Sequence, residues 1–264
     1  LVEDGTNRLK ECVNKSDLFG NNALALACVY SIESKRHSKH QCIELLLKYG
    51  SNPNVRNVIT GFTPLHWSAR YGELNIVKLL CEKKAIDYLP DKDGYTPLDY
   101  AGTFGHKDVV HYLVLSLWKK CKSRLQQEST DVRNDLHMSQ YVFDKVPNTI
   151  FSVPSNIASR IKTKKYLQRN IFECSDFLLS PVLRSNILYW ACTLPENVFD
   201  WHQLRELMND ISPFPECQNL IIKNQTSVHA ASISGNWKKL KLLLQNINLR
   251  YMTKSVNKEK GDKN

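Results

Sequence analysis

The chain has 264 residues, of which 42% are hydrophobic and 23% charged, enough for one extended domain or two compact ones with packed cores. No apolar run reaches the ~20 residues of a membrane-spanning helix, and no basic-then-apolar signal pattern opens the chain. Because the chain begins at Leu1, we expect it to be an excerpt of a longer protein. Eight cysteines without a C-x-x-C pair predict reduced, buried thiols in a cytoplasmic protein, with the nucleus as the alternative.

The net charge of +10 is concentrated in two segments. Residues 119–169 carry eleven basic and four acidic residues, a net charge of +7. Residues 248–264 carry five basic and two acidic residues, a net charge of +3. The remainder of the chain therefore sums to zero, and the basic character belongs to a connector and a tail.

In chain order, the first predicted element is a helix over Gly5–Val13. It is read as the second helix of a repeat whose first helix is cut off. A helix pair follows in Asn21–Cys28 and Gln41–Asn54, with the insertion SIESKRHS between its two helices.

The next two elements, GFTPLHWSARYGELNIVKLL (Gly61–Leu80) and GYTPLDYAGTFGHKDVVHYL (Gly94–Leu113), are copies of one another at an offset of 33 residues. Thr63 can cap the first helix of its copy, and a proline follows in the first turn, where no backbone N–H is needed. Gly72 separates the two helices. The second helix then buries the apolar face formed by Ile76, Val77, Leu79 and Leu80.

A period of 33 residues with T-P-L-H and a later glycine resembles the ankyrin repeat. The resemblance covers roughly 1–115 and 185–247, and it implies an all-α ankyrin-repeat solenoid of helix-turn-helix repeats with short β-hairpin loops. It also implies that His66 and His229 hydrogen-bond backbone between adjacent repeats. The residues with structural roles are then Thr63, Pro64, Leu65, His66, Gly72, Thr96, Pro97, Leu98, Gly105, His229 and Gly235.

The predicted organisation has four parts. Residues 1–118 form a first stack of a partial repeat and three full ones, and Asp99 in the histidine position supports a break near residue 118 because T-P-L-D is common near the end of a stack. Residues 119–184 form a basic, non-repeat connector, read as an extension of the last helix, then a loop, with a degenerate repeat as an alternative for part of it. Residues 185–247 form a second repeat pair, and residues 248–264 a disordered basic tail.

The residues offer no enzymatic chemistry. No phosphate-binding loop, dinucleotide fingerprint, nucleophile elbow or zinc-protease motif is present, and the carboxylates are scattered, so no catalytic or cofactor-binding residue is assigned. Three metal-ligand types stand close together at His37, His40 and Cys42, but a zinc site needs a second pair. Cys42 also aligns with the buried position of Ile76, so no metal residue is assigned.

The leading hypothesis is therefore a non-enzymatic scaffold that binds a partner protein of unknown identity. The resemblance implies that partners contact the hairpin tips and the exposed face of each first helix, while Trp67 and Tyr100 lean into the core. The aromatic and arginine content of these positions is typical of an interface hot spot, although Phe62 and Tyr95 could instead stack on each other. The predicted partner-binding residues are Ile59, Phe62, Arg70, Tyr71, Lys92, Asp93, Tyr95, Thr103 and Phe104.

Two alternatives remain from the sequence. The basic runs of residues 119–124 and 160–169 suit nucleic acid, an anionic lipid surface or a nuclear-localisation signal, although such runs are more often solvated faces. The repeats could also be the regulatory segment of a larger enzyme or of a ubiquitin-ligase adaptor, because this fold does not itself specify function.

Overall fold

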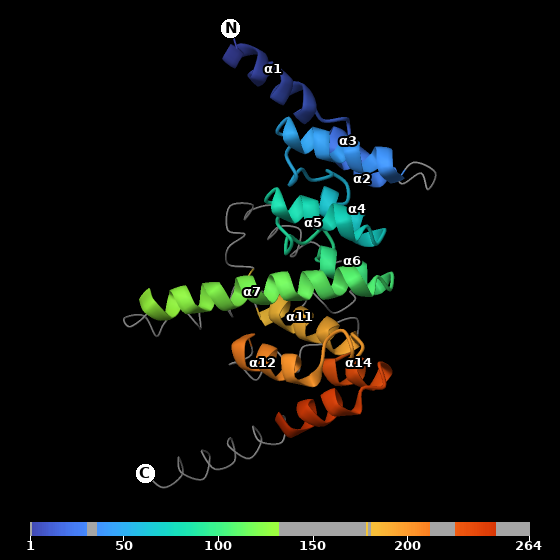
Figure 1. Cartoon of the computed structure of the whole chain (residues 1–264), viewed down its shortest axis with the longest axis vertical. Coiled ribbons are helices and arrows are strands. Elements are labelled where there is room, and N and C mark those ends of the chain that lie inside the picture. The colour runs from blue at the N-terminus through green and yellow to red at the C-terminus, as the bar shows by residue number, and fades with distance from the viewer. Residues whose placement is uncertain (1, 31–35, 132–177, 179–180, 212–224, 247–264) are drawn as a thin grey trace, which may run out of the picture. The chain divides into compact units, whose positions relative to one another are not determined.

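A computed structural model describes residues 2–30, 36–131, 178, 181–211 and 225–246. The described residues form helices joined by turns (Figure 1). They fall into two compact units, the first made of the described residues up to Leu113 and the second of those from Val114 onward. None of the described helices is both long enough and apolar enough to cross a membrane.

The first unit is built from paired helices in two rows. The short helices α2, α4 and α6 contact one another in succession, and α3 contacts α5 in a second row (Figure 1). This arrangement confirms the all-α repeat solenoid expected from the 33-residue period. The elements are α1 (Val2–Asn14), α2 (Ala23–Val29), α3 (Arg36–Lys48), α4 (Pro64–Arg70), α5 (Leu74–Glu82), α6 (Pro97–Thr103) and the first residues of α7 (Lys107–Asp131).

The starts of the short helices follow from their capping residues. Thr63 is the N-cap of α4, and its hydroxyl accepts the His66 N–H while the His66 ring accepts the Thr63 N–H. In α6, the Asp99 carboxylate takes the place of that ring and accepts the N–H and hydroxyl of Thr96 at 2.9 and 2.8 Å. Each capping box satisfies backbone donors that a helix N-terminus otherwise leaves unpaired.

The core of the first unit lies between the stacked helices. Leu65 and Ala69 of α4 and Leu98 and Ala101 of α6 are fully buried. On α5, Ile76, Val77 and Leu80 are buried, as the sequence predicts, whereas Leu79 is partly exposed. No single repeat covers its own apolar face, so each neighbour completes the core of the one before it.

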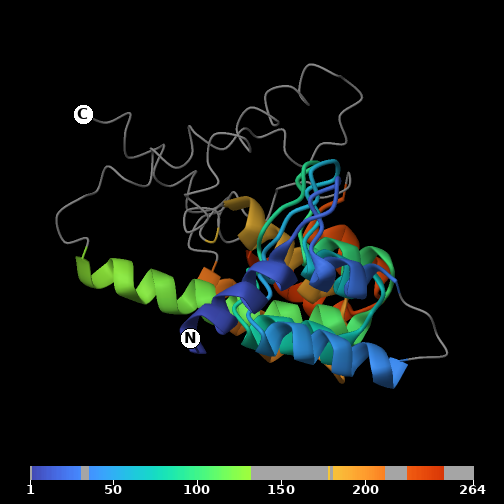
Figure 2. The same ribbon diagram turned by 90° about the horizontal axis from the view of Figure 1, so that it is seen from above.

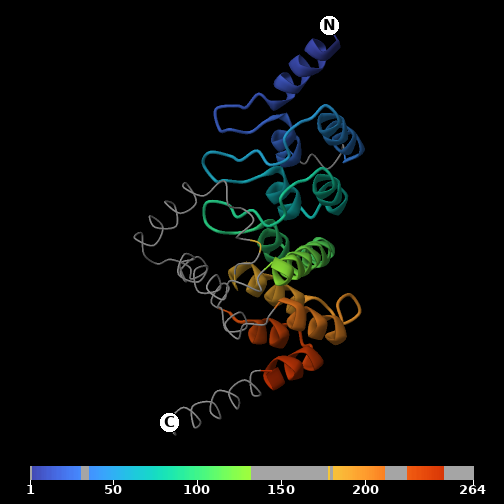
Figure 3. The same cartoon turned by 90° about the vertical axis from the view of Figure 1, so that its left-hand side faces the viewer.

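The loops before α2, α4 and α6 project together from one side of the first unit (Figures 2 and 3). We call them the fingers. Successive fingers are joined by backbone hydrogen bonds, from Val58 N–H to the Phe19 carbonyl at 2.8 Å and from Lys92 N–H to the Thr60 carbonyl at 3.0 Å. The fingers are tight turns, and no β-strand forms within the described residues, because so few bonds join one finger to the next.

Asp17, Asn57 and Asp91 shape the three fingers in the same way. Each side-chain oxygen accepts N–H groups from residues two to four positions further along the chain. Such turns fold the backbone locally without a partner strand. The finger tips are therefore held by their own side chains as well as by their neighbours.

The second unit contains the remainder of α7, α11 (Pro181–Thr193), α12 (Trp201–Ile211), α14 (Ser227–Ile233) and a helix over residues 237–246. Helix α11 contacts both α12 and α14. Trp118 of α7 donates from its indole N–H to the Asp210 carboxylate of α12 at 2.9 Å, and its ring meets Phe199 at 6.2 Å. Lys122 also pairs with Asp210 at 2.9 Å.

A buried lysine completes the second unit. The Lys239 side chain is fully buried, and its ammonium donates to the carbonyls of Ala191 and Leu194 at 3.1 and 2.8 Å. Burial lowers the pKa of Lys239, although neighbouring carboxylates and the Cys192 thiol oppose that shift. The ammonium lies 5.4 Å from the centroid of the Phe199 ring, and it satisfies carbonyls that the end of α11 leaves without intrahelical partners.

The boundaries of the compact units and of α11 differ from the predicted segment boundaries. Their boundary falls between residues 113 and 114, inside α7, and α11 begins at Pro181, four residues before the predicted repeat. The sequence LVLSLWKKCKSRLQQ extends the helix of the preceding repeat as expected. The predicted loop, the degenerate repeat and the basic tail lie wholly or almost wholly outside the described residues, so the four-part organisation stays a prediction.

The prediction that the cysteines are buried holds for only some of them. Cys28, Cys121 and Cys192 are buried, and burial raises the pKa of the Cys28 and Cys192 thiols to about 12. Cys42 is exposed, so its alignment with the buried Ile76 gave a wrong expectation. Its neighbour Ile43 is fully buried instead and makes the core contact of α3.

Candidate functional site

The predicted partner-binding residues lie on the first unit in two groups. The first group is at the finger tips, where Ile59 is 63% exposed and Asp93 is exposed, while Lys92 and Tyr95 are half-buried. The Lys92 ammonium donates to the carbonyl of Val58 in the preceding finger. Among the predicted residues, the tips therefore present the apolar Ile59 and several polar side chains on a backbone held by the neighbouring finger.

The second group lies where the short helices end. Tyr71 is the C-cap residue of α4 and Phe104 that of α6, and their side chains are 42% and 47% exposed. The guanidinium carbon of Arg70, the residue before Tyr71, lies 4.6 Å from the centroid of the Phe104 ring. Thr103 is exposed, and its hydroxyl donates to the Asp99 carbonyl at 2.6 Å.

Phe62 does not belong to this surface, which corrects the sequence analysis. Its side chain is only 7% exposed, and its ring lies 4.8 Å from both the Trp67 and the Tyr100 rings and 5.3 Å from the His66 ring. The expected partner, Tyr95, instead meets Tyr100 at 6.1 Å. Phe62 thus turns from the finger into the core between two repeats.

Trp67 and Tyr100, in contrast, are more exposed than the sequence analysis expected. Both were expected in the core, but both are half-buried. The Trp67 ring stacks on the exposed Tyr71 ring at 6.2 Å with an angle of 17° between their planes. The buried Phe62 is therefore the base of an aromatic cluster that reaches the surface at Tyr71.

Tyr100 is anchored by a carboxylate beneath the finger. Its hydroxyl donates to the fully enclosed Asp91 at 2.7 Å, and burial raises the pKa of Tyr100 above its usual range. Burial likewise raises the pKa of Asp91 to about 6, although hydrogen bonds from Tyr100 and from the Tyr95 and Asp93 amides oppose the shift. Asp91 therefore couples the third finger to α6.

His66 joins two neighbouring repeats through hydrogen bonds of both ring nitrogens. Its Nδ1 accepts the Thr63 N–H at 3.1 Å, so Nε2 carries the proton and donates to the Tyr95 carbonyl at 3.2 Å. Burial lowers the pKa of His66 to about 3, so the ring is neutral at physiological pH. His229 makes the same capping contact with Thr226, but it is exposed and reaches no carbonyl of a further repeat among the described residues.

Gly72 shows why the repeat needs a glycine after its first helix. Its φ is +71°, and an added Cβ would lie 2.3 Å from the His106 ring. That ring donates from Nε2 to the Arg70 carbonyl at 2.9 Å. Gly105 and Gly235 have similar positive φ values but leave open space at the same position.

The sequence analysis missed exposed apolar residues in the first described repeat. Tyr30 is 69% exposed and is the C-cap residue of α2, the position held by Tyr71 in α4 and Phe104 in α6. When the repeats are aligned with Asn22 on Thr63, Tyr30 falls at the position of Tyr71. The insertion after Tyr30 interrupts the period, so this correspondence was missed. In the fingers, Leu18, Phe19 and Val58 are 95%, 52% and 54% exposed.

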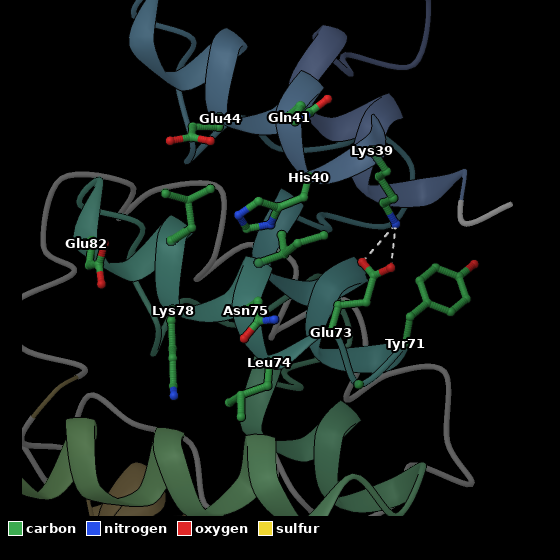
Figure 4. A pocket seen from close by; sticks show the side chains of 13 residues that line it. Lys39, His40, Gln41, Glu44, Tyr71, Glu73, Leu74, Asn75, Lys78 and Glu82 are labelled. Atoms are coloured by element: carbon green, nitrogen blue, oxygen red, sulfur yellow. Dashed lines mark hydrogen bonds and ion pairs between the residues drawn. The ribbon is translucent and has the colours of Figure 1, made fainter. Parts of the chain in front are cut away.

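A groove of about 1050 Å³ lies between α3 and α5 (Figure 4). At one end, the Lys39 ammonium bridges both oxygens of the Glu73 carboxylate at 2.7 and 2.8 Å, and this pair is largely buried. Tyr71 reaches the edge of the groove, so the groove adjoins the surface at the helix ends. The remaining lining includes carboxylates and an ammonium of opposite charge, such as Glu44, Glu82 and Lys78.

Comparison with known protein families identifies the repeats. Residues 30–124 match the family described as ankyrin repeats, in three copies. The match covers both 33-residue copies and the helices that precede and follow them. The resemblance stated from the T-P-L-H motif is thereby confirmed.

Three curated relatives illustrate how widely similar sequences occur. The chain is 32% identical over 102 residues to glycerophosphocholine phosphodiesterase GDE1 of Candida albicans, covering 39% of this chain and 8% of that protein. It is 27% identical over 223 residues to SMC5-SMC6 complex localization factor protein 1 of Bos taurus, covering 82% and 19%. It is 39% identical over 70 residues to cyclin-dependent kinase inhibitor 2A of Homo sapiens, covering 26% and 45%. The chain thus spans less than half of each of these relatives.

Proposed function

We propose that this chain, whose residues 30–124 are ankyrin repeats, is a non-catalytic segment that binds a partner protein. The binding site is the surface of the fingers and of the ends of α4 and α6, called the finger–helix surface here. It comprises Ile59, Arg70, Tyr71, Lys92, Asp93, Tyr95, Thr103 and Phe104.

The observation that carries this proposal is the repeated aromatic residue at the end of each short helix. Tyr30, Tyr71 and Phe104 occupy the same C-cap position in three successive repeats, and each is at least 42% exposed. A packed repeat does not need a large exposed ring at that position. Aromatic side chains are enriched among residues that dominate binding energy, so a row of them favours an interface.

The rigidity of the surface supports the same proposal. The His66 and His106 rings join backbone groups of neighbouring repeats, and fingers bond to one another. A surface held in this way loses little conformational entropy when a partner binds.

The partner itself is not specified by the relatives. The bovine relative is named for localisation of the SMC5-SMC6 complex, and the human relative for inhibition of a cyclin-dependent kinase. The 223 residues aligned with the bovine protein are more than the 30–124 family match spans, so the similarity to that protein extends beyond residues 30–124. We keep the partner as a protein of unknown identity, with a cytoplasmic location and the nucleus as alternative.

The test is affinity capture with variants of the full chain. Wild-type chain is used to capture and identify a partner, which is then purified and titrated against Tyr71→Ala/Phe104→Ala. We expect the double variant to weaken binding by about a hundredfold, typical of two hot-spot residues. A matched control, Leu45→Ala/Tyr49→Ala, removes side chains that are 54% and 46% exposed on and just after α3. Equal binding by a folded double variant would refute the site.

Binding of nucleic acid or anionic lipid through residues 119–169 remains the alternative proposal. Only residues 119–131 of this segment are described; they continue α7, where Lys122 already pairs with Asp210. A salt titration separates the two functions, because phosphate binding weakens steeply as salt rises and an aromatic protein interface changes little. A regulatory role within a larger enzyme or ubiquitin-ligase adaptor stays compatible with either.

A further inference from the structure

Arg70 is the one cation on the finger–helix surface whose side chain is fixed by an aromatic ring. It is the last residue of α4, it is half-buried, and its guanidinium carbon lies 4.6 Å from the centroid of the Phe104 ring in the next repeat. Stacking on an aromatic face holds a guanidinium flat and leaves its N–H groups directed outward along its edge.

The backbone of Arg70 is fixed as well. The His106 ring donates to the Arg70 carbonyl at 2.9 Å, and the same ring packs against Gly72 so closely that an added Cβ would overlap it. Both the side chain and the main chain of Arg70 are therefore ordered by the following repeat. An arginine ordered in this way loses little rotamer entropy on forming a salt bridge, which exposed pairs usually lose.

Three carboxylates of this repeat and the next are already bound to other groups. Glu73, three residues further along the chain, points its carboxylate at Lys39, which bridges both of its oxygens (Figure 4). Asp91 accepts the Tyr100 hydroxyl and two backbone N–H groups, and Asp99 accepts the N–H and hydroxyl of Thr96. Within the part of the chain that the structure describes, Arg70 has no carboxylate partner.

We propose that Arg70 binds an aspartate or glutamate carboxylate of the partner protein, next to an apolar side chain that packs on Tyr71 and Phe104. This inference rests on the proposed function and names the chemistry of the partner at that surface. A planar guanidinium matches a carboxylate with two parallel hydrogen bonds. Tyr71 and Phe104, of which 42% and 47% are exposed, supply the apolar contact beside it.

A carboxylate fits this site better than a phosphate. Phosphorylated segments are generally recognised by clusters of arginines, because a phosphate carries nearly two negative charges at neutral pH. Here the neighbouring cation of the surface, Lys92, donates to the Val58 carbonyl, and Lys39 is held by Glu73. Arg70 is the one guanidinium among the residues of the finger–helix surface and is not part of an arginine cluster, so the partner segment is an acidic–apolar peptide.

The experiment selects peptides without assuming their sequence. A display library of random dodecapeptides is panned on the full wild-type chain, and enriched peptides are synthesised and titrated by fluorescence anisotropy. We expect an aspartate or glutamate next to an aromatic or aliphatic residue among the enriched peptides. Arg70→Gln should weaken these peptides by at least about tenfold, and Arg70→Lys by an intermediate factor because it keeps the charge but loses the planar fork.

The control is Lys78→Gln, which removes the same charge from an exposed position on α5. Circular dichroism confirms that each variant is folded. Peptides that bind Arg70→Gln and Lys78→Gln equally well, or that carry no acidic residue but are lost in Tyr71→Ala/Phe104→Ala, overturn the carboxylate inference and leave the finger–helix surface standing. Enriched peptides that also survive Tyr71→Ala/Phe104→Ala, or a library that yields no binder, count against both proposals.

Discussion

The imidazole of His66 donates a hydrogen bond to the backbone carbonyl of Tyr95, 29 residues away in the next repeat, at 3.2 Å. The donor nitrogen is set by Thr63, whose N–H occupies the other ring nitrogen. One side chain thus caps its own helix and holds the following finger. The finger that it holds carries Lys92, Asp93 and Tyr95, so the proposed binding surface depends on this contact.

This relationship predicts a specific loss of stability in acid. Burial lowers the pKa of His66 from 6.5 to about 3, so the neutral ring is favoured in the folded state. The contribution is fully present above pH 6.5 and is lost as the pH falls toward 3, with a total of about 5 kcal/mol. Protonation of Nδ1 would also remove the acceptor for the Thr63 N–H.

The measurement compares urea unfolding of wild type and His66→Gln between pH 7 and pH 4, with hydrogen exchange used to read the first unit. We expect the gap between the two proteins to shrink as the pH falls. Asp91 titrates in the opposite sense, because its raised pKa of about 6 stabilises the protonated folded form as the pH falls, and it is present in both proteins. A gap that stays constant over this range contradicts the role given to His66.

Gly72→Ala should be much more damaging than Gly105→Ala. Both glycines have positive φ, +71° and +79°, so each alanine carries a similar backbone strain of about 1 kcal/mol. Only at Gly72 would the added Cβ overlap the His106 ring. The ring would then have to move and lose its hydrogen bond to the Arg70 carbonyl. We expect a total cost of about 3 kcal/mol at Gly72. Thermal unfolding of the two variants gives the comparison, and equal costs would show that the ring contact is unimportant.

Lys239 is predicted to stabilise the second unit far more than its neighbour Lys238. Replacing the buried Lys239 by methionine leaves the Ala191 and Leu194 carbonyls without their donor, at a cost of about 2 kcal/mol. Lys238 is 47% exposed and lies 3.9 Å from Glu196, so Lys238→Met should change little. Four of the five tryptophans belong to the second unit, so tryptophan fluorescence in urea reports its unfolding. Equal midpoints for the two variants would contradict the prediction.

The fold was largely predictable because the repeat encodes it locally. The T-P dipeptides at 63–64 and 96–97 mark the starts of α4 and α6, and the glycines at 72 and 105 mark the ends of the same helices. Such signals lie within one repeat and survive in a single sequence. The insertion after Tyr30 interrupted the period, so the aromatic residue in the first described repeat was missed although it occupies the same C-cap position.

The binding surface was less predictable because side-chain direction depends on the neighbouring repeat. Phe62 follows a finger tip in sequence, yet the Phe62 ring is buried in the core, where it packs against Tyr100 of the next repeat. Trp67 lies on the face of α4 that was expected to be covered, yet its ring reaches Tyr71 and remains half-exposed. Neither outcome follows from spacing alone: the Phe62 ring depends on a contact across repeats, and the Trp67 ring depends on the Tyr71 ring at the end of its own helix.

The most direct test of the account is a hydroxyl-radical footprint of the chain with its captured partner. This measurement reports the exposure of aromatic side chains without any substitution. The account predicts that oxidation of Tyr71 and Phe104 falls when the partner binds, while Tyr49, 46% exposed just after α3, is oxidised as in the free chain. Protection of Tyr49 with unchanged oxidation of Tyr71 and Phe104 would place the partner elsewhere and contradict the central claim.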